Sequence, residues 1–276
     1  MERIFDNHFH LNFHNDYMSS VMIFKKAGGT SINLTNLPFH GDATADHYAN
    51  LYEKHLRMAG DVKERSGIDV VITIGPYPLD IFTLWKDIHE GEEMARKGID
   101  LAVKLCMEGK ANAVGEIGRP HFPVDHEIME ACNRVMGYAF QKCSDSSIPV
   151  ILHTEDLDKN GAGEIESMAV KSGMKPEMVV KHHAMPQSLL FDSNLVFSVP
   201  ANRKAIRDSM DTGKYFMMET DHINDPANPG KYLPADAVPK RAEWIRQEYG
   251  EKGERLLQKA FFDIPERLFG ENSFRV

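Results

Sequence analysis

Two histidines near the start of the chain, His8 and His10, stand two residues apart in the segment Asp6-Asn7-His8-Phe9-His10. Successive side chains of a strand point to opposite faces, so both imidazoles project to the same face, about 6.5–7 Å apart along the chain. Metal–nitrogen bonds are about 2.0–2.1 Å long, which lets both rings turn onto one cation. A single pair of this kind is also compatible with ordinary buried or surface histidines, so its interpretation depends on the rest of the chain.

Four further apolar runs end in acidic or histidine side chains. These ends are Gly115-Glu116-Ile117-Gly118, Leu152-His153-Thr154-Glu155, Lys181-His182-His183 and Glu219-Thr220-Asp221. Each has an ordinary structural interpretation by itself: Glu116 could pair with Arg119, and Asp221 could cap the loop that follows. Five such ends together favour metal ligation, because each would otherwise need its own buried partner. The glycines around Glu116 also indicate close packing around a bridging ligand.

These ends belong to eight short apolar runs, each followed by a polar tip and a segment of helical periodicity. The runs cover residues 3–7, 30–35, 69–74, 111–117, 149–153, 178–182, 195–199 and 215–220. Apolar strands that alternate with helices indicate a parallel sheet covered on both faces. Eight such units favour an α/β fold, a single-domain (β/α)8 TIM-like barrel over residues 1–276, ahead of an open doubly wound sheet. Such a barrel brings the carboxyl ends of its strands to one mouth.

The helices that complete these units follow from the apolar periodicity. We expect them over residues 17–26, 43–66, 78–108, 124–143, 161–171, 186–191, 201–210, 238–249 and 252–262. Gly98 is the place where the third could break. The segment 220–239, rich in Pro, Asn and Asp, is expected to form one long loop over the mouth.

Composition narrows the class of protein. Lys and Arg total 32 against 41 Asp and Glu, a net charge of −9, which disfavours long nucleic acids as partners. The three cysteines are an odd number without CxxC spacing, typical of a reducing compartment. The chain begins without the pattern of a signal or transit peptide, and no stretch approaches eighteen uncharged apolar residues. We expect a cytoplasmic protein that does not bind membranes.

The order of the motifs resembles a known family. HxH, then GEIG, then a His after a Pro-apolar strand, then a second His, then ETD is similar to the TatD-related metal-dependent hydrolases of the amidohydrolase superfamily, over nearly the whole chain. The closing segment 263–269 resembles that family's terminal motif, with Asp263 where Asn is common. After GEIG, however, Arg119-Pro120-His121 stands where bacterial DNases of the family usually have Leu-Asp, which weakens the transfer of nuclease activity. A seven-stranded histidinol-phosphatase-like barrel also begins with HxH, but it normally needs more His and Asp ligands.

The resemblance implies a dinuclear metal centre. It makes His8, His10 and Asp221 ligands of one divalent cation, Glu116 a bridge, and His153 with a histidine of the sixth run ligands of the second. A His, Asp and Glu set leaves the metal open among Zn, Mn, Ni and Mg. Two cations that share a carboxylate can hold a hydroxide between them, and Asp221 is then the expected catalytic residue, first as general base and later as proton donor.

The histidine of the sixth run is His182 or His183, which have opposite strand parity. Alignment with the family favours His183, and we predict His183 as the ligand. Strand parity opposes this choice, because it also turns Lys181 inward, where its charge requires Glu219 or Asp6 as a partner.

The resemblance favours hydrolysis of a phosphoester in a small anionic or polar substrate. A lactone or cyclic-amide hydrolase with the same centre and a non-catalytic metal-binding module are the alternatives. Arg119 and His121 are predicted to bind substrate, with a surface salt bridge as the alternative for Arg119. Glu219 shares the face of Asp221 and could orient a ligand or pair with Lys181. Specificity is expected in loops 36–46, 119–124 and 222–239. The histidines expected in solvent or loops are His40, His47, His55 and His126.

Overall fold

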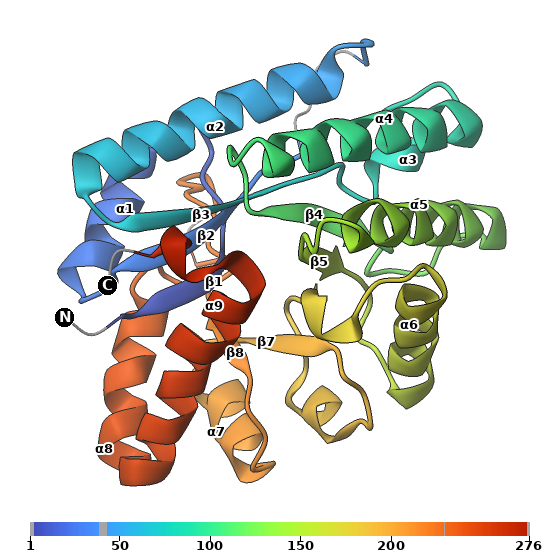
Figure 1. The fold of residues 1–276 in the computed structure, drawn as a ribbon. Helices are drawn as coiled ribbons and strands as arrows, with labels where there is room; N and C mark the ends of the chain where they lie inside the picture. Colours follow the sequence, from blue (N-terminus) through green and yellow to red (C-terminus); the bar gives the residue numbers. More distant parts are fainter. Residues whose placement is uncertain (1–2, 39–42, 229, 275–276) are drawn as a thin grey trace.

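A ring of eight parallel strands forms the centre of the molecule (Figure 1). The computed structural model describes residues 3–38, 43–228 and 230–274. Its strands are β1 (Phe5–Phe9), β2 (Ser31–Thr35), β3 (Asp69–Ile74), β4 (Ala113–Gly118), β5 (Val150–His153), β6 (Val179–Lys181), β7 (Val196–Pro200) and β8 (Met217–Glu219). Each pairs with the next in chain order. The predicted (β/α)8 TIM barrel is confirmed.

The ring closes between β1 and the residues that directly follow β8. His10 donates its backbone N–H to the His222 carbonyl at 2.8 Å, and Asp221 donates its own to the His8 carbonyl at 2.9 Å. The closure therefore places the HxH segment beside Asp221, although the two are more than 200 residues apart.

Helices surround the barrel on its outside (Figure 1). They are α1 (Tyr17–Lys26), α2 (His47–Ser66), α3 (Asp80–Thr83), α4 (Ile88–Met107), α5 (His126–Ser144), α6 (Lys159–Lys171), α7 (Arg203–Asp211), α8 (Ala237–Gln258) and α9 (Ile264–Phe269). Short 3₁₀ turns are η1 (Pro176–Met178), η2 (Pro186–Leu190) and η4 (Glu271–Ser273), and η3 (Lys259–Asp263) is a π-helical turn. None of these helices combines the length and apolar character needed to cross a membrane.

The predicted helix over 78–108 is divided at another place than Gly98. The chain leaves the helix after α3 and restarts at α4, where the Asp87 carboxylate caps the new helix by accepting from Glu90 N–H at 2.9 Å. Gly98 lies inside α4, and a Cβ there would come within 2.7 Å of the Tyr48 ring. Gly98 therefore serves close packing of α4 on α2, and it does not break the helix.

Side chains of β1 divide between the barrel interior and the helix layer as strand parity predicts. Phe9 is fully buried, and its ring centroid lies 6.1 Å from that of Phe24 in α1. His8 and His10 turn the other way, toward the interior. The end of the chain supports the same strand, since the Phe269 ring of α9 lies 6.0 Å from that of Phe5.

Candidate metal centre

Glu116 of β4 stands in the middle of four imidazoles. Its Oε1 contacts His8 Nε2 and lies 3.1 Å from His10 Nε2. Its Oε2 lies 3.3 Å from His153 Nδ1 and 4.0 Å from His182 Nε2. Each carboxylate oxygen thus faces its own pair of ring nitrogens, from β1 on one side and from the ends of β5 and β6 on the other.

Glycines allow β4 to carry Glu116 this deep into the barrel. A Cβ at Gly115 would lie 2.7 Å from the Ile151 carbonyl oxygen, and one at Gly118 would lie 2.1 Å from that of His153. Gly118 also has a φ of +138°, which residues with a side chain rarely adopt. The close packing expected around Glu116 is therefore the packing of β4 against β5.

The orientation of the His10 ring follows from its hydrogen bonds. Its Nδ1 lies 2.9 Å from the Thr35 carbonyl oxygen, which can only accept, so Nδ1 carries the proton. Its Nε2 then faces Glu116 Oε1 at 3.1 Å and Asp221 Oδ1 at 3.3 Å. Although burial lowers it, hydrogen bonds to Asp221 and Glu116 raise the pKa of His10 to about 10, so Nε2 carries a second proton between these two anionic oxygens. A divalent metal bound to Nε2 would replace that proton and supply the positive charge.

Asp6 stabilises the β1 side of the centre through hydrogen bonds. Its carboxylate accepts from His8 N–H at 3.2 Å, from Thr220 N–H at 3.0 Å and from the Thr220 hydroxyl at 2.7 Å. It therefore ties β1 to the segment that carries Asp221. Burial raises the pKa of Asp6 to about 7, against the effect of these hydrogen bonds.

On the other side, His182 is oriented by a buried carboxylate. Its Nδ1 lies 3.2 Å from Glu219 Oε1, which leaves Nε2 directed at His153 Nδ1, 3.2 Å away. A ligand histidine commonly donates its second N–H to a carboxylate in this way, which fixes the ring and its tautomer. Glu219 thus takes the orienting position that its parity suggested, and it does not pair with Lys181.

His153 is held by two side chains from neighbouring loops. Its Nε2 lies 3.3 Å from the Tyr77 hydroxyl and 3.0 Å from His121 Nδ1. Its Nδ1 therefore remains the nitrogen directed at Glu116. Tyr77 was not predicted from the sequence, because the run 69–74 ends without an acidic or histidine side chain that would mark its end as part of a site.

His183 lies outside this ring of nitrogens. Its side chain is 51% exposed, and its Nδ1 lies 3.2 Å from Asp221 Oδ2. The strand β6 ends at Lys181, and His183 has a φ of +50°, so the alternation of a strand does not continue to it. His182 therefore occupies the place beside Glu116 and His153 for which His183 was predicted.

Four groups of side chains among the described residues could each hold a metal ion, because their ligand atoms lie within 4.8 Å of one another. They are His8-His10-Glu116, Glu116-His153-His182, His8-His182-Asp221 and His182-His183-Glu219. The first two share Glu116, as two neighbouring cations would require. Although burial raises them, nearby histidines hold the pKa values of Glu116 and Asp221 well below their usual ranges, so both carboxylates are ionised.

The two predicted substrate-binding residues differ in their surroundings. Arg119 is only 3% exposed, and its guanidinium donates to Asn133 and pairs with Glu155 and Glu164. The salt-bridge alternative for Arg119 therefore describes these contacts, which lie in a buried position rather than at the surface. His121, in contrast, lines a cavity of about 440 Å³ together with His153, His182 and Asp221.

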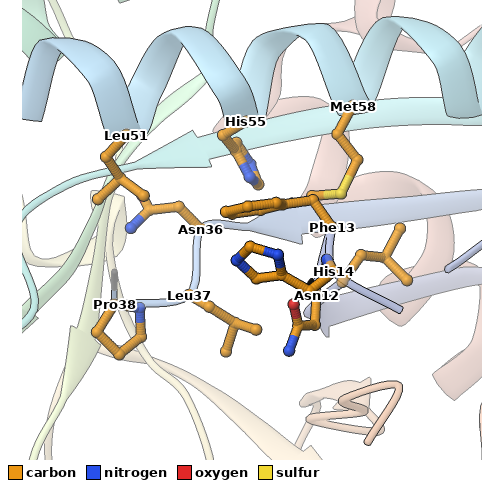
Figure 2. Close-up of a pocket in the computed structure, with 10 residues that line it drawn as sticks. Asn12, Phe13, His14, Asn36, Leu37, Pro38, Leu51, His55 and Met58 are labelled. Carbon is orange, nitrogen blue, oxygen red and sulfur yellow. Dashed lines mark hydrogen bonds between the residues drawn. The ribbon is translucent and has the colours of Figure 1, made fainter. Parts of the chain in front are cut away.

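A second cavity, of about 230 Å³, lies between α2 and the loops after β1 and β2 (Figure 2). Phe13, His14 and His55 contribute rings to it, and its remaining walls are mostly aliphatic. None of its lining residues also lines the cavity at His121, His153 and Asp221. His55 and His47 are buried, against the prediction that they lie in solvent or loops, because α2 packs them against the barrel. His40 and the loop residues 39–42 and 229 lie outside the described residues.

Comparison with known proteins agrees with the motif order. Residues 5–270 match the model of the family described as TatD related DNase. The chain belongs to this family, so the predicted metal-dependent hydrolase is confirmed at that level. The uncharacterized protein MJ1127 of Methanocaldococcus jannaschii is 27% identical over 241 residues, which are 85% of this chain and 84% of that protein.

Solved structures share the fold at lower identity. A TatD-like protein of Archaeoglobus fulgidus superposes with a TM-score of 0.66 and 16% identity, covering 96% of this chain and 99% of that one. The TatD homologue YjjV of Escherichia coli gives 0.67 and 16%, with 96% and 97% covered. A mutant PTE-like lactonase of Deinococcus radiodurans gives 0.65 and 13%, with 97% and 95% covered.

Proposed function

We propose that the chain hydrolyses a phosphoester bond of a small substrate with the help of two divalent cations. The observation that carries this proposal is the position of Glu116, whose two oxygens each face a separate pair of imidazoles. A carboxylate so placed is suited to bridge two cations about 3.5–4 Å apart.

The proposed ligands follow from the directions of the ring nitrogens. His8, His10 and Asp221 would hold the first cation, and His153 and His182 the second. Glu116 would contact both. This set keeps the sequence assignment except for His182, which replaces His183 because its Nε2 points at the Glu116 side while His183 contacts Asp221.

Two divalent cations bound here would polarise the scissile bond and lower the pKa of a water molecule toward about 7. Asp221 is suited to take the proton of that water and to return it to the leaving group, because its carboxylate is ionised and 26% exposed toward the mouth. His183 Nδ1, 3.2 Å from Asp221 Oδ2, would fix the direction of that carboxylate.

Family membership favours a phosphoester, and the cavity favours a small molecule. About 440 Å³ lies within the range of small-molecule sites, and the net charge of −9 opposes a long polyanion. Activity on DNA would fall by orders of magnitude between about 50 and 200 mM salt, whereas we expect a shallow dependence on salt. The three cysteines are free thiols, which supports the cytoplasm as the proposed compartment.

A lactonase with the same centre is the second candidate, since the Deinococcus structure of the same fold is called a PTE-like lactonase. A screen of phosphomonoesters, phosphodiesters, lactones and cyclic amides with Zn, Mn, Ni and Mg separates the two. We expect phosphoesters to be turned over most efficiently. Metal content after dialysis against excess metal tests the centre: about two cations per chain are expected, and a value that stays near zero would sink the proposal.

A further inference from the structure

A lysine lies next to the proposed ligands without an acidic partner. Lys181, the last residue of β6, is only 3% exposed. Its Nζ donates to the Thr154 carbonyl at 3.2 Å and to the His182 carbonyl at 2.7 Å. An ammonium group has three N–H donors, and among the described residues no third acceptor and no carboxylate oxygen within 4.0 Å meets this one.

This ammonium borders the cavity at the centre. Lys181 lines the same cavity of about 440 Å³ as His121, His153 and Asp221. Its two carbonyl partners belong to the residue after His153 and to His182 itself. The amine therefore lies between the ends of β5 and β6, on the side of the proposed second cation.

The acidic groups around Lys181 form no ion pair with its Nζ among the described residues. Glu219 accepts from His182 Nδ1 and from His183 N–H through Oε1, and its buried Oε2, which has no hydrogen-bond partner, lies more than 4.0 Å from that Nζ. Glu116 faces the imidazoles, and Asp156 is exposed at the rim of the cavity. A buried ammonium without a direct counter-ion is costly, and an anionic oxygen placed at its free N–H would offset that cost with a charged hydrogen bond.

We propose that Lys181 is an oxyanion subsite, which binds a negatively charged phosphoryl or carboxylate oxygen of the substrate on the β5–β6 side of the cavity. The inference rests on the proposed function and narrows its substrate class to molecules that are anionic at this position. It gives Lys181 an anion-binding role that the sequence analysis expected of Arg119, whose guanidinium pairs with Glu155 and Glu164.

A purely structural Lys181 is the competing explanation, because its carbonyl partners lie beside two proposed ligands. The two explanations differ in what Lys181→Met changes. An oxyanion subsite affects charged substrates only, whereas a structural role affects metal content and all substrates alike. Lys97→Met is the matched control, since Lys97 in α4 has a side chain that is 61% exposed and pairs with Glu93.

The experiment compares variant and unmodified protein on two matched pairs, a phosphodiester with its neutral phosphotriester and a carboxylate-bearing lactone with its methyl ester. For each substrate, the KM of the variant is divided by the KM of the unmodified protein. This ratio removes differences in intrinsic reactivity between the substrates. We expect Lys181→Met to raise KM for a charged member by roughly ten- to a hundredfold, as for loss of a charged hydrogen bond. The neutral members and the metal content stay unchanged, and Lys181→Arg retains most of the preference. The pair that responds identifies the oxyanion as phosphoryl or carboxylate.

Binding of inorganic phosphate to the metal-loaded protein, measured by calorimetry, tests the subsite without turnover. Lys181→Met should weaken the binding of phosphate, and Lys97→Met should leave it unchanged. Equal losses on charged and neutral substrates, or loss of metal, would overturn the subsite while leaving the proposed hydrolase intact. Failure of the unmodified protein to bind metal or to cleave any substrate would instead defeat the proposed function. If Lys181→Met does not fold, the unmodified protein alone tests the inference. Equal KM values for the charged and the neutral member of each pair, together with no binding of phosphate, would overturn it.

Discussion

The two sides of the candidate centre are held by different parts of the chain. On the β1 side, His10 is oriented by the main-chain carbonyl of Thr35, and barrel closure pairs the backbone of His8 with that of Asp221. On the β5–β6 side, side chains orient the proposed ligands. Glu219 orients His182, and Tyr77 and His121 contact His153.

The β1 side is held by main-chain contacts that come with the fold, whereas the β5–β6 side is held by individual side chains. Main-chain hydrogen bonds on the β1 side exist wherever the barrel closes, so point substitutions around His10 leave them in place. The β5–β6 side depends on side chains that a substitution can remove. Loss of a supporting group of this kind typically lowers metal affinity by about 10–100-fold. We therefore expect the β5–β6 side to be the adjustable half of the centre.

The largest effect should come from Glu116→Ala, which removes the one group common to both sides. Both cations should bind more weakly, and activity should fall by more than about 10⁴-fold, beyond the contribution of a single general base. Metal analysis and turnover measure this, with Glu53→Ala on the exposed face of α2 as the control. If one cation remained at full occupancy, Glu116 would belong to one side only.

Asp221→Asn tests the chemistry of the β1–β8 side. The amide keeps the shape of the side chain but does not accept a proton, so turnover should fall by roughly 10²–10⁴-fold. The fold and at least one cation should remain, as circular dichroism and metal analysis would show. Full activity on the best substrate would reduce Asp221 to a structural ligand.

The β5–β6 side is tested by two adjacent alanine variants. His182→Ala removes a proposed ligand and should weaken binding of one cation by at least about 100-fold, the upper end of the range for groups that only support a ligand. His183→Ala removes only the contact with Asp221 and should weaken metal binding by no more than about tenfold, the lower end of that range. Metal titrations of the two proteins are compared directly. A greater loss of metal from His183→Ala would restore the assignment made from the sequence.

The sequence predicted the two sides unequally, for a physical reason. Strand parity placed His8 and His10 correctly because β1 is five residues long and continues through Phe9. The sixth strand has only three residues and stops at Lys181, and there the family alignment outweighed the objection from parity and gave His183, where the structure places His182 beside Glu116. The fold was predictable because eight apolar runs recur, whereas the α3–α4 break depends on the cap at Asp87.

Contacts between loops were beyond the reach of the sequence. The enclosure of Arg119 depends on Glu155 and Glu164, which follow another strand. Tyr77 reaches His153 across the β4 end, and no spacing along the chain indicates that contact.

A small effect is expected from Tyr77→Phe, and it sharpens the comparison most. With Nδ1 of His153 directed at Glu116, Nε2 carries the proton and donates to the Tyr77 hydroxyl or to His121 Nδ1. Removing the hydroxyl leaves His121 as the acceptor, so metal affinity should fall only about two- to tenfold, at or below the lower end of the usual range for supporting groups. The double variant Tyr77→Phe with His121→Ala removes both acceptors. Its loss of metal-binding free energy should exceed the sum of the losses in the two single variants, because each acceptor substitutes for the other. Metal titration of the three proteins tests this. Strict additivity would mean that the two contacts act independently and that the β5–β6 side is held by the barrel as firmly as the β1 side.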